Sequence, residues 1–132
     1  MFHYSFQRRI SIKENILIEK SLTFASKIVK LHSILTKEKK ESTISKQIIR
    51  SATSIGANIN EANYGISKAD FISKMQIALK ETAETEYWLR LLTVSEYIDT
   101  KKSLELLSDC LELKRILVAT LNTSKENKSN CK

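Results

Sequence analysis

The scarcity of glycine and proline is the feature that most restricts how this chain can fold. Among its 132 residues there is no proline, and the two glycines are Gly56 and Gly65. Hairpins and β-sandwiches need these residues at their tight turns, so a chain almost without them has few places to reverse direction. The sequence therefore predicts a few long helices with short connections, which is an all-α fold. The length is that of one domain.

Four stretches of the sequence carry apolar residues at the spacing of an amphipathic helix. We expect helices at about 14–35, 44–64, 68–97 and 100–121. Because the connections are too short to cross a bundle, the predicted fold is an antiparallel up-down-up-down four-helix bundle within residues 1–121. Residues 122–132 have no apolar side chain except Cys131, so we expect a disordered polar tail there.

Each predicted helix has one apolar stripe that we assign to the core. These stripes are Leu17, Phe24, Ile28, Leu31 and Leu35; then Ile44, Ile48, Ala52, Ile55, Ile59 and Ala62; then Phe71, Met75, Ala78, Leu79, Thr82, Leu89 and Leu92; and finally Leu104, Leu107, Leu111, Ile116 or Leu117, and Leu121. Ser42 or Thr43 is expected to cap the second helix, and Gly65 is expected to end it in the left-handed conformation. Ser67 and Asp70 have the spacing of a capping box at the start of the third helix.

The positive charge of the chain is concentrated near its beginning. The net charge is +7, of which residues 1–43 supply +5 and residues 123–132 supply +2. Lys13, Lys20 and Lys27 follow one another at seven-residue intervals on the first helix, and we call these three lysines the basic ridge. Such a surface can follow a phosphate backbone, although lysines also serve solubility alone. The candidate nucleic-acid-binding residues are Lys13, Lys20, Lys27, Lys30, Lys37, Lys39 and Lys40.

A second polar stripe lies on the second helix. Arg50, Asn58 and Glu61 line up there at helical spacing, together with Gln47 and Ser54. Two interpretations are open. The stripe is either a solvated face or a hydrogen-bonded polar seam between helices or subunits.

The sequence contains no recognised motif for catalysis or metal binding. Neither His3 nor His32 has a glutamate three residues before it, as a carboxylate-bridged metal bundle needs. Cys110 and Cys131 have no metal-ligand spacing, and two isolated glycines cannot form a phosphate-binding loop. We therefore expect no enzyme, metal or cofactor. Without a signal peptide or a long apolar run, we expect a cytoplasmic protein that does not engage a membrane.

Three runs of the sequence resemble a known bacterial protein family. Residues 47–62 read QIIRSATSIGANINEA, residues 67–72 read SKADFI, and residues 80–89 read KETAETEYWL. They are similar to four-helix-bundle proteins first noticed as products of intervening sequences in large-subunit ribosomal RNA genes. The first helix is similar to one subgroup, so the likeness covers about residues 14–121. Many members carry Asn-Ile-Ala-Glu-Gly followed by an arginine, whereas residues 58–62 here read NINEA with no arginine before Ser67.

The resemblance implies a left-handed bundle that assembles into a ring, in known cases a homopentamer with a central channel. One branch is similar to accessory proteins of diversity-generating retroelements, whose basic pentamers bind nucleic acid and a reverse transcriptase. By this analogy Arg50, Asn58 and Glu61 are structural or intersubunit residues, and the lysines form the contact surface. The expected function is therefore an oligomeric protein that binds RNA or DNA. The alternative is a protein-interaction scaffold, or an accessory subunit of a polymerase or reverse transcriptase, that does not touch nucleic acid.

Overall fold

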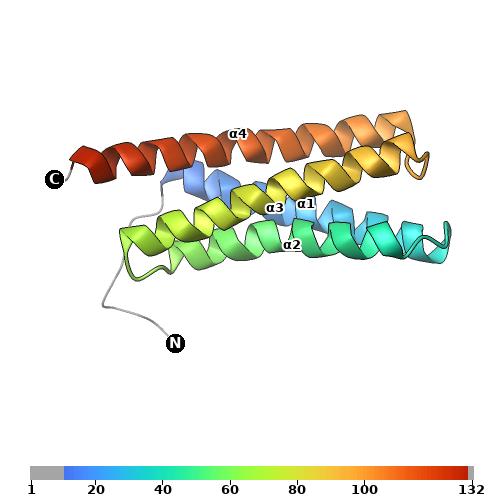
Figure 1. The fold of residues 1–132 in the computed structure, drawn as a ribbon, viewed down its shortest axis with the longest axis horizontal. Coiled ribbons are helices and arrows are strands. Elements are labelled where there is room, and N and C mark those ends of the chain that lie inside the picture. Colours follow the sequence, from blue (N-terminus) through green and yellow to red (C-terminus); the bar gives the residue numbers. More distant parts are fainter. Residues whose placement is uncertain (1–10, 131–132) are drawn as a thin grey trace.

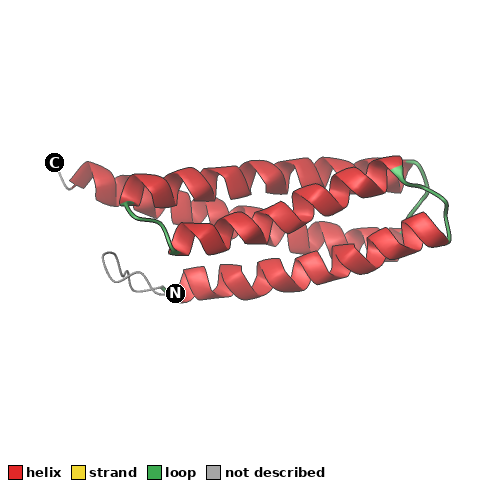
Figure 2. Ribbon diagram, turned by 90° about the horizontal axis from the view of Figure 1, so that it is seen from below, coloured by secondary structure: helices red, strands yellow, loops and turns green. Residues whose placement is uncertain are grey.

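The computed structural model describes residues 11–130, and four long helices account for most of them (Figure 1). The helices are α1 (Ile12–Lys37), α2 (Thr43–Asn63), α3 (Lys68–Val94) and α4 (Thr100–Asn130). Successive helices run in opposite directions, and each packs on two neighbours in the cyclic order α1, α2, α3, α4. The predicted all-α, up-down-up-down bundle is confirmed, and residues 11–130 contain no strand (Figure 2).

Side-chain caps fix where the helices begin. The Ser11 hydroxyl accepts the Glu14 N–H at 3.1 Å, and the Ser67 hydroxyl accepts the Asp70 N–H at 3.1 Å. Ser42 stands at the N-cap position of α2, as predicted, but its side chain makes no capping hydrogen bond, and the Glu41 carboxylate caps the first turn instead. The nearly buried Glu41 carboxylate accepts the N–H groups of residues 43–45 at 2.8–3.0 Å, because it reaches all three free donors of the first turn.

Backbone closure ends α3 three residues earlier than predicted. Glu96 adopts a left-handed φ of 64°, the Tyr97 N–H donates to the Leu92 carbonyl at 2.9 Å, and the Glu96 N–H donates to Thr93 at 3.0 Å. This pair of bonds is the Schellman arrangement, which stops a helix without glycine. Gly65, in contrast, does not have a positive φ, so its predicted left-handed cap is wrong.

The predicted disordered tail is wrong for residues 122–130, which continue α4. No proline or glycine interrupts this stretch, and the buried Ser124 follows the buried Thr120 and Leu121 on the inner side of the helix. The last turns of α4 extend past the beginning of α1 (Figure 1). Residues 131 and 132, the rest of the predicted tail, lie outside the described residues.

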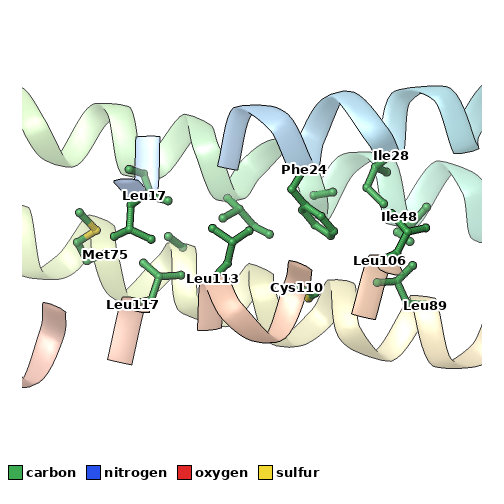
Figure 3. Close-up of a cluster of buried hydrophobic side chains, with 14 of the residues drawn as sticks. Leu17, Phe24, Ile28, Ile48, Met75, Leu89, Leu106, Cys110, Leu113 and Leu117 are labelled. Atoms are coloured by element: carbon green, nitrogen blue, oxygen red, sulfur yellow. The ribbon is translucent and has the colours of Figure 1, made fainter. Parts of the chain in front are cut away.

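The core forms where one stripe from each helix meets the other three (Figure 3). The stripes predicted for the first three helices are buried, apart from Ile44 and Leu79, which are partly buried. In α4 the first half of the predicted stripe is wrong. Leu106, Cys110, Leu113, Leu117 and Leu121 face the core, whereas Leu104 and Leu111 are 65% and 42% exposed. The helix carries two apolar stripes, and only one of them can face the bundle.

Candidate functional site

The basic ridge lies along the contact between α1 and α4. The Lys20 ammonium is 3.1 Å from the Glu112 carboxylate. The Lys27 ammonium donates to Asp109 at 2.7 Å and lies 3.0 Å from Glu105. Lys13, the third ridge lysine, is exposed and forms no ion pair within residues 11–130. Two of the three ridge lysines therefore join helices within one protomer.

These contacts keep the charges of the ridge and its partners locally balanced. The hydrogen bond that the Lys27 ammonium donates to Asp109, followed by the one that it donates to Glu105, raises the pKa of Lys27. The same contact with Lys27 lowers the pKa of Glu105. Both groups stay ionised at neutral pH, so the positive charge of Lys27 is offset by carboxylates beside it. The ridge thus contributes less outward positive field than its sequence spacing suggested.

The other four candidate lysines lie toward one end of the bundle. Lys30 and Lys37 are on the last third of α1, and Lys39 and Lys40 are in the α1–α2 connection. All four are exposed and form no ion pair within the described part of the chain. The α3–α4 connection reaches the same end (Figure 2), which brings in the first lysines of α4. We call these lysines the basic end: Lys30, Lys37, Lys39, Lys40, Lys101 and Lys102.

Sequence reasoning missed Lys101 and Lys102. Residues 44–122 sum to zero charge, so nothing in the local composition singled them out. The predicted topology held the signal, because an up-down bundle places the start of its fourth helix at the same end as the finish of its first. Glu38 and Glu96 are also exposed at this end, and Lys102 lies 3.7 Å from Glu105.

A cavity of about 510 Å³ opens at the basic end. Its apolar wall comes from Leu31, Ile34 and Ile98, and the partly exposed Tyr97 lines it as well. Its charged lining consists of Lys39 from the α1–α2 connection, Glu96 and Asp99 from the α3–α4 connection, and Lys102 from the first turn of α4. The cavity therefore lies between the last turns of α1 with the α1–α2 connection and the α3–α4 connection with the first turn of α4, which are distant in the sequence.

The polar stripe of α2 faces α3. The Arg50 guanidinium donates to Glu81 at 3.4 Å and to Glu84, and Glu84 also accepts the indole N–H of Trp88 at 3.0 Å. Glu61 lies 3.1 Å from the Lys74 ammonium. These contacts join α2 and α3 within the protomer.

Arg50 and its α3 partner Glu84 have shifted pKa values, and Asn58 of the polar stripe has partners on its own helix. The Trp88 hydrogen bond, then Arg50, lowers the pKa of Glu84. The hydrogen bond to Glu84 raises the pKa of Arg50. Asn58 donates instead to the Ser54 carbonyl and hydroxyl of its own helix. Arg50 and Glu84 thus form a fixed ion pair between two helices of one chain.

The second apolar stripe of α4 remains on the surface. We call it the outer stripe, and it consists of Leu104, Leu107, Leu111 and Val118. Leu107 is partly buried and the other three are exposed. A shallow groove of about 660 Å³ runs over the first three, bordered by Glu112 and Arg115. A seven-residue repeat of this kind is typical of a helix that packs against another helix.

The described residues offer little reactive chemistry. Burial raises the pKa of the Cys110 thiol to about 12, and its sulfur donates to the Thr82 carbonyl at 3.4 Å. The thiol is thus protonated at neutral pH. Residues 11–130 contain no group of three or more His, Cys, Asp or Glu side chains placed to hold a metal ion. No helical segment among them combines the length and the apolarity that crossing a bilayer requires.

Comparison with known proteins agrees with the fold. The family model described as 23S rRNA-intervening sequence protein matches residues 13–119. A crystal structure from Bacteroides thetaiotaomicron, of a protein with unknown function from the S23 ribosomal protein family, shares 49% sequence identity with this chain and superposes with a TM-score of 0.83. The match covers 84% of this chain and 99% of that one. No curated protein matches the sequence.

Proposed function

Because this chain belongs to the family of 23S rRNA-intervening sequence proteins, we propose that it is a non-enzymatic, ring-forming bundle protein that binds RNA or DNA through lysines. The family description names ribosomal RNA, but the surface of this chain carries the argument. The main contact surface in this proposal is the basic end rather than the basic ridge. Lys20 and Lys27 already have carboxylate partners, and a phosphate would have to compete with those carboxylates.

The observation that supports the proposal best is the set of exposed lysines without carboxylate partners. Lys30, Lys37, Lys39 and Lys40 lie within one helix end and one short connection, and none forms an ion pair within the described residues. A phosphate that meets such an ammonium releases its condensed counterions without first breaking a salt bridge. Binding should therefore be strong at low salt and should weaken steeply as salt rises.

Assembly is the second part of the proposal, and it is supported by the outer stripe. Leu104, Leu111 and Val118 recur at seven-residue intervals on α4. The bundle core is already filled by the other apolar stripe of this helix, so these three side chains remain on the surface. Covering such residues with another copy would remove apolar surface from water at about 25 cal/mol per Å². Five copies at +7 each would pool roughly +35 on one particle, which raises its attraction for a polyanion.

The nucleic-acid part is tested by measuring the affinity for a structured RNA and a duplex DNA as salt rises. A variant with glutamine at Lys30, Lys37, Lys39 and Lys40 should bind more weakly, and its log–log salt slope should fall by about 0.9 for each lost phosphate contact to duplex DNA. The control carries glutamine at four lysines elsewhere, namely Lys13, Lys68, Lys80 and Lys125. It loses the same charge, so an equal effect of both variants, or no binding at low salt, would refute the proposed surface.

The assembly part is tested by sedimentation of the purified chain. The wild type should sediment as a multiple of the 15.1 kDa chain, and Leu111→Glu should shift it toward the single chain because a carboxylate would enter the contact. Ile66→Glu, at an exposed residue in the α2–α3 connection, is the control and should leave the mass unchanged. A wild type that sediments as one chain at every concentration contradicts this part.

The outer stripe also supports the alternative of a protein-interaction scaffold. A helix from a polymerase or reverse transcriptase could lie along Leu104, Leu107 and Leu111 in place of a second copy. Stable co-purification of one such protein after nuclease treatment, abolished by Leu111→Glu, would favour the scaffold. Salt-sensitive RNA binding by the purified chain would favour the nucleic-acid function.

A further inference from the structure

The cavity at the basic end combines an aromatic ring with two lysines, one from the α1–α2 connection and one from the first turn of α4. Tyr97 is held in place by its backbone, since its N–H bonds to the Leu92 carbonyl at 2.9 Å directly after the left-handed Glu96. Its ring packs partly on the core and lines the cavity. Because the ring is partly buried against the core, Tyr97 has less rotamer freedom to lose when it meets a ligand than a fully exposed tyrosine has.

The two lysines differ in how freely they can meet a ligand. Lys39 is exposed and has no ion pair within residues 11–130. Lys102 lies on the first turn of α4, and its contact with Glu105 is long, at 3.7 Å. Exposed pairs of this kind are weak, so the Lys102 ammonium is available to an anion at little cost.

The two carboxylates of the cavity do not match a bare phosphate. The Asp99 carboxylate already has a partner, because its Oδ1 accepts the backbone N–H of Lys102 at 2.8 Å at the start of α4. Glu96 is exposed and has no ion pair within the described residues. A carboxylate accepts hydrogen bonds from the exocyclic amines of nucleobases, whereas it repels phosphate. The lining therefore fits a ligand that has both an amine-bearing ring, which can meet Glu96, and a negatively charged group, which can meet Lys39 and Lys102.

We propose that this cavity binds one unpaired nucleotide of a nucleic-acid strand. The base would stack on Tyr97 with its amine toward Glu96, and the flanking phosphates would meet Lys39 and Lys102. A volume of about 510 Å³ is within the range of small-ligand sites and accommodates one nucleoside. Bases inside a duplex are stacked on one another and cannot enter. This inference rests on the proposed function and deepens it, because it makes single-stranded segments the preferred ligand.

The test measures the affinity of the protein for four fluorescent oligonucleotides, each about 12 nucleotides long. They are a single-stranded RNA, the same sequence as single-stranded DNA, a blunt DNA duplex, and an abasic strand that keeps only the sugar-phosphate backbone. The wild type should bind both base-containing strands more tightly than the duplex or the abasic strand. Tyr97→Leu should weaken binding to these strands by about tenfold and leave duplex and abasic binding unchanged, since stacking one base is worth about that much. Comparing RNA with DNA shows whether the sugar hydroxyl contributes.

Three controls keep the outcomes separate. Tyr97→Phe keeps the ring and should bind like the wild type, and Tyr64→Leu removes an exposed tyrosine at the opposite end without effect. Thermal unfolding of each variant shows that the bundle is intact. If no ligand binds at low salt, the proposed function itself fails. If all ligands bind equally, or Tyr97→Leu weakens duplex and single strand alike, the cavity inference is refuted while the proposed function stands.

Discussion

At the scale of single residues, the two glycines differ in how much room the structure leaves for a side chain. A Cβ on Gly65 would lie 2.9 Å from the Asp70 carboxylate and 3.1 Å from the Ala62 carbonyl oxygen, which is backbone and cannot move alone. A Cβ on Gly56 would lie 3.3 Å from the Ser21 hydroxyl, which is a side chain that can rotate. The close approach of neighbouring atoms, and not a left-handed φ, therefore explains why residue 65 is glycine. The sequence alone does not distinguish these two causes.

Gly65→Ala should lower the free energy of unfolding by about 1–2 kcal/mol, because the new methyl group overpacks the α2–α3 connection. Gly56→Ala is the matched comparison. It should be close to neutral, since the gain in helix propensity of about 1 kcal/mol offsets the adjustment at Ser21. Urea unfolding of both variants checks this. The close-approach explanation is wrong if Gly65→Ala is as stable as Gly56→Ala.

At the scale of helices, the sequence predicted the existence and direction of all four but not the rotation of α4. In α1, α2 and α3 one apolar stripe dominates, so the face that the bundle buries is evident from spacing alone. In α4, residues 104, 107, 111 and 118 compete with residues 106, 110, 113 and 117. Both sets of residues recur at helical spacing, so the sequence pattern does not show which set the bundle buries. The contacts with α1 and α3 decide between them, and these contacts are tertiary.

Alanine substitutions at two leucines of α4 measure this rotation directly. Leu113→Ala should cost about 2–5 kcal/mol of unfolding free energy, since the side chain is 1% exposed and its loss leaves a cavity. Leu104→Ala should change the stability of the single chain by less than about 0.5 kcal/mol, because most of that side chain meets water. Chemical denaturation at protein concentrations too low for assembly makes the comparison. Similar losses at both positions would mean that α4 is rotated differently.

The candidate site was predictable only in part, for a related reason. The seven-residue spacing of Lys13, Lys20 and Lys27 correctly places them on one side of α1, but a single helix contains no information about its neighbour's charge. The missing signal was on α4, where Glu105, Asp109 and Glu112 follow one another at helical spacing and face the ridge. A complementary pair of stripes predicts an interhelix contact rather than a free basic surface.

At the scale of the whole molecule, three of the four helix contacts contain a carboxylate with a lowered pKa. Trp88 and Arg50 lower the pKa of Glu84 between α2 and α3, and Lys27 lowers that of Glu105 between α1 and α4. Between α3 and α4, Glu86 accepts hydrogen bonds from Arg90 at 2.8 Å and Lys114 at 3.2 Å, which lower its pKa as well. Ionised carboxylates therefore contribute to three of the four helix contacts, and Glu84 and Glu86 contribute more than Glu105, because Glu105 is more exposed to water.

The direction of the pH effect follows from these shifts. A carboxyl whose pKa is lower when folded than the ordinary 4.5 binds protons less readily in the folded state than in the unfolded state. Its stabilising contribution is complete well above pH 4.5, and it is lost as the pH falls through the lowered folded value. The net charge of +7 also becomes more positive in acid, so repulsion acts in the same direction.

We therefore expect the free energy of unfolding to be nearly constant between pH 6 and 8 and to fall steadily below about pH 4.5. Urea unfolding at a series of pH values in low salt measures this. Glu86→Gln should be less stable than the wild type at pH 7 but should lose less on acidification, because its amide does not titrate. Glu96→Gln, at an exposed residue without an ion pair within residues 11–130, is the control and should keep the wild-type slope. If Glu86→Gln and Glu96→Gln have the same pH slope, the carboxylate contacts between helices do not cause the acid sensitivity.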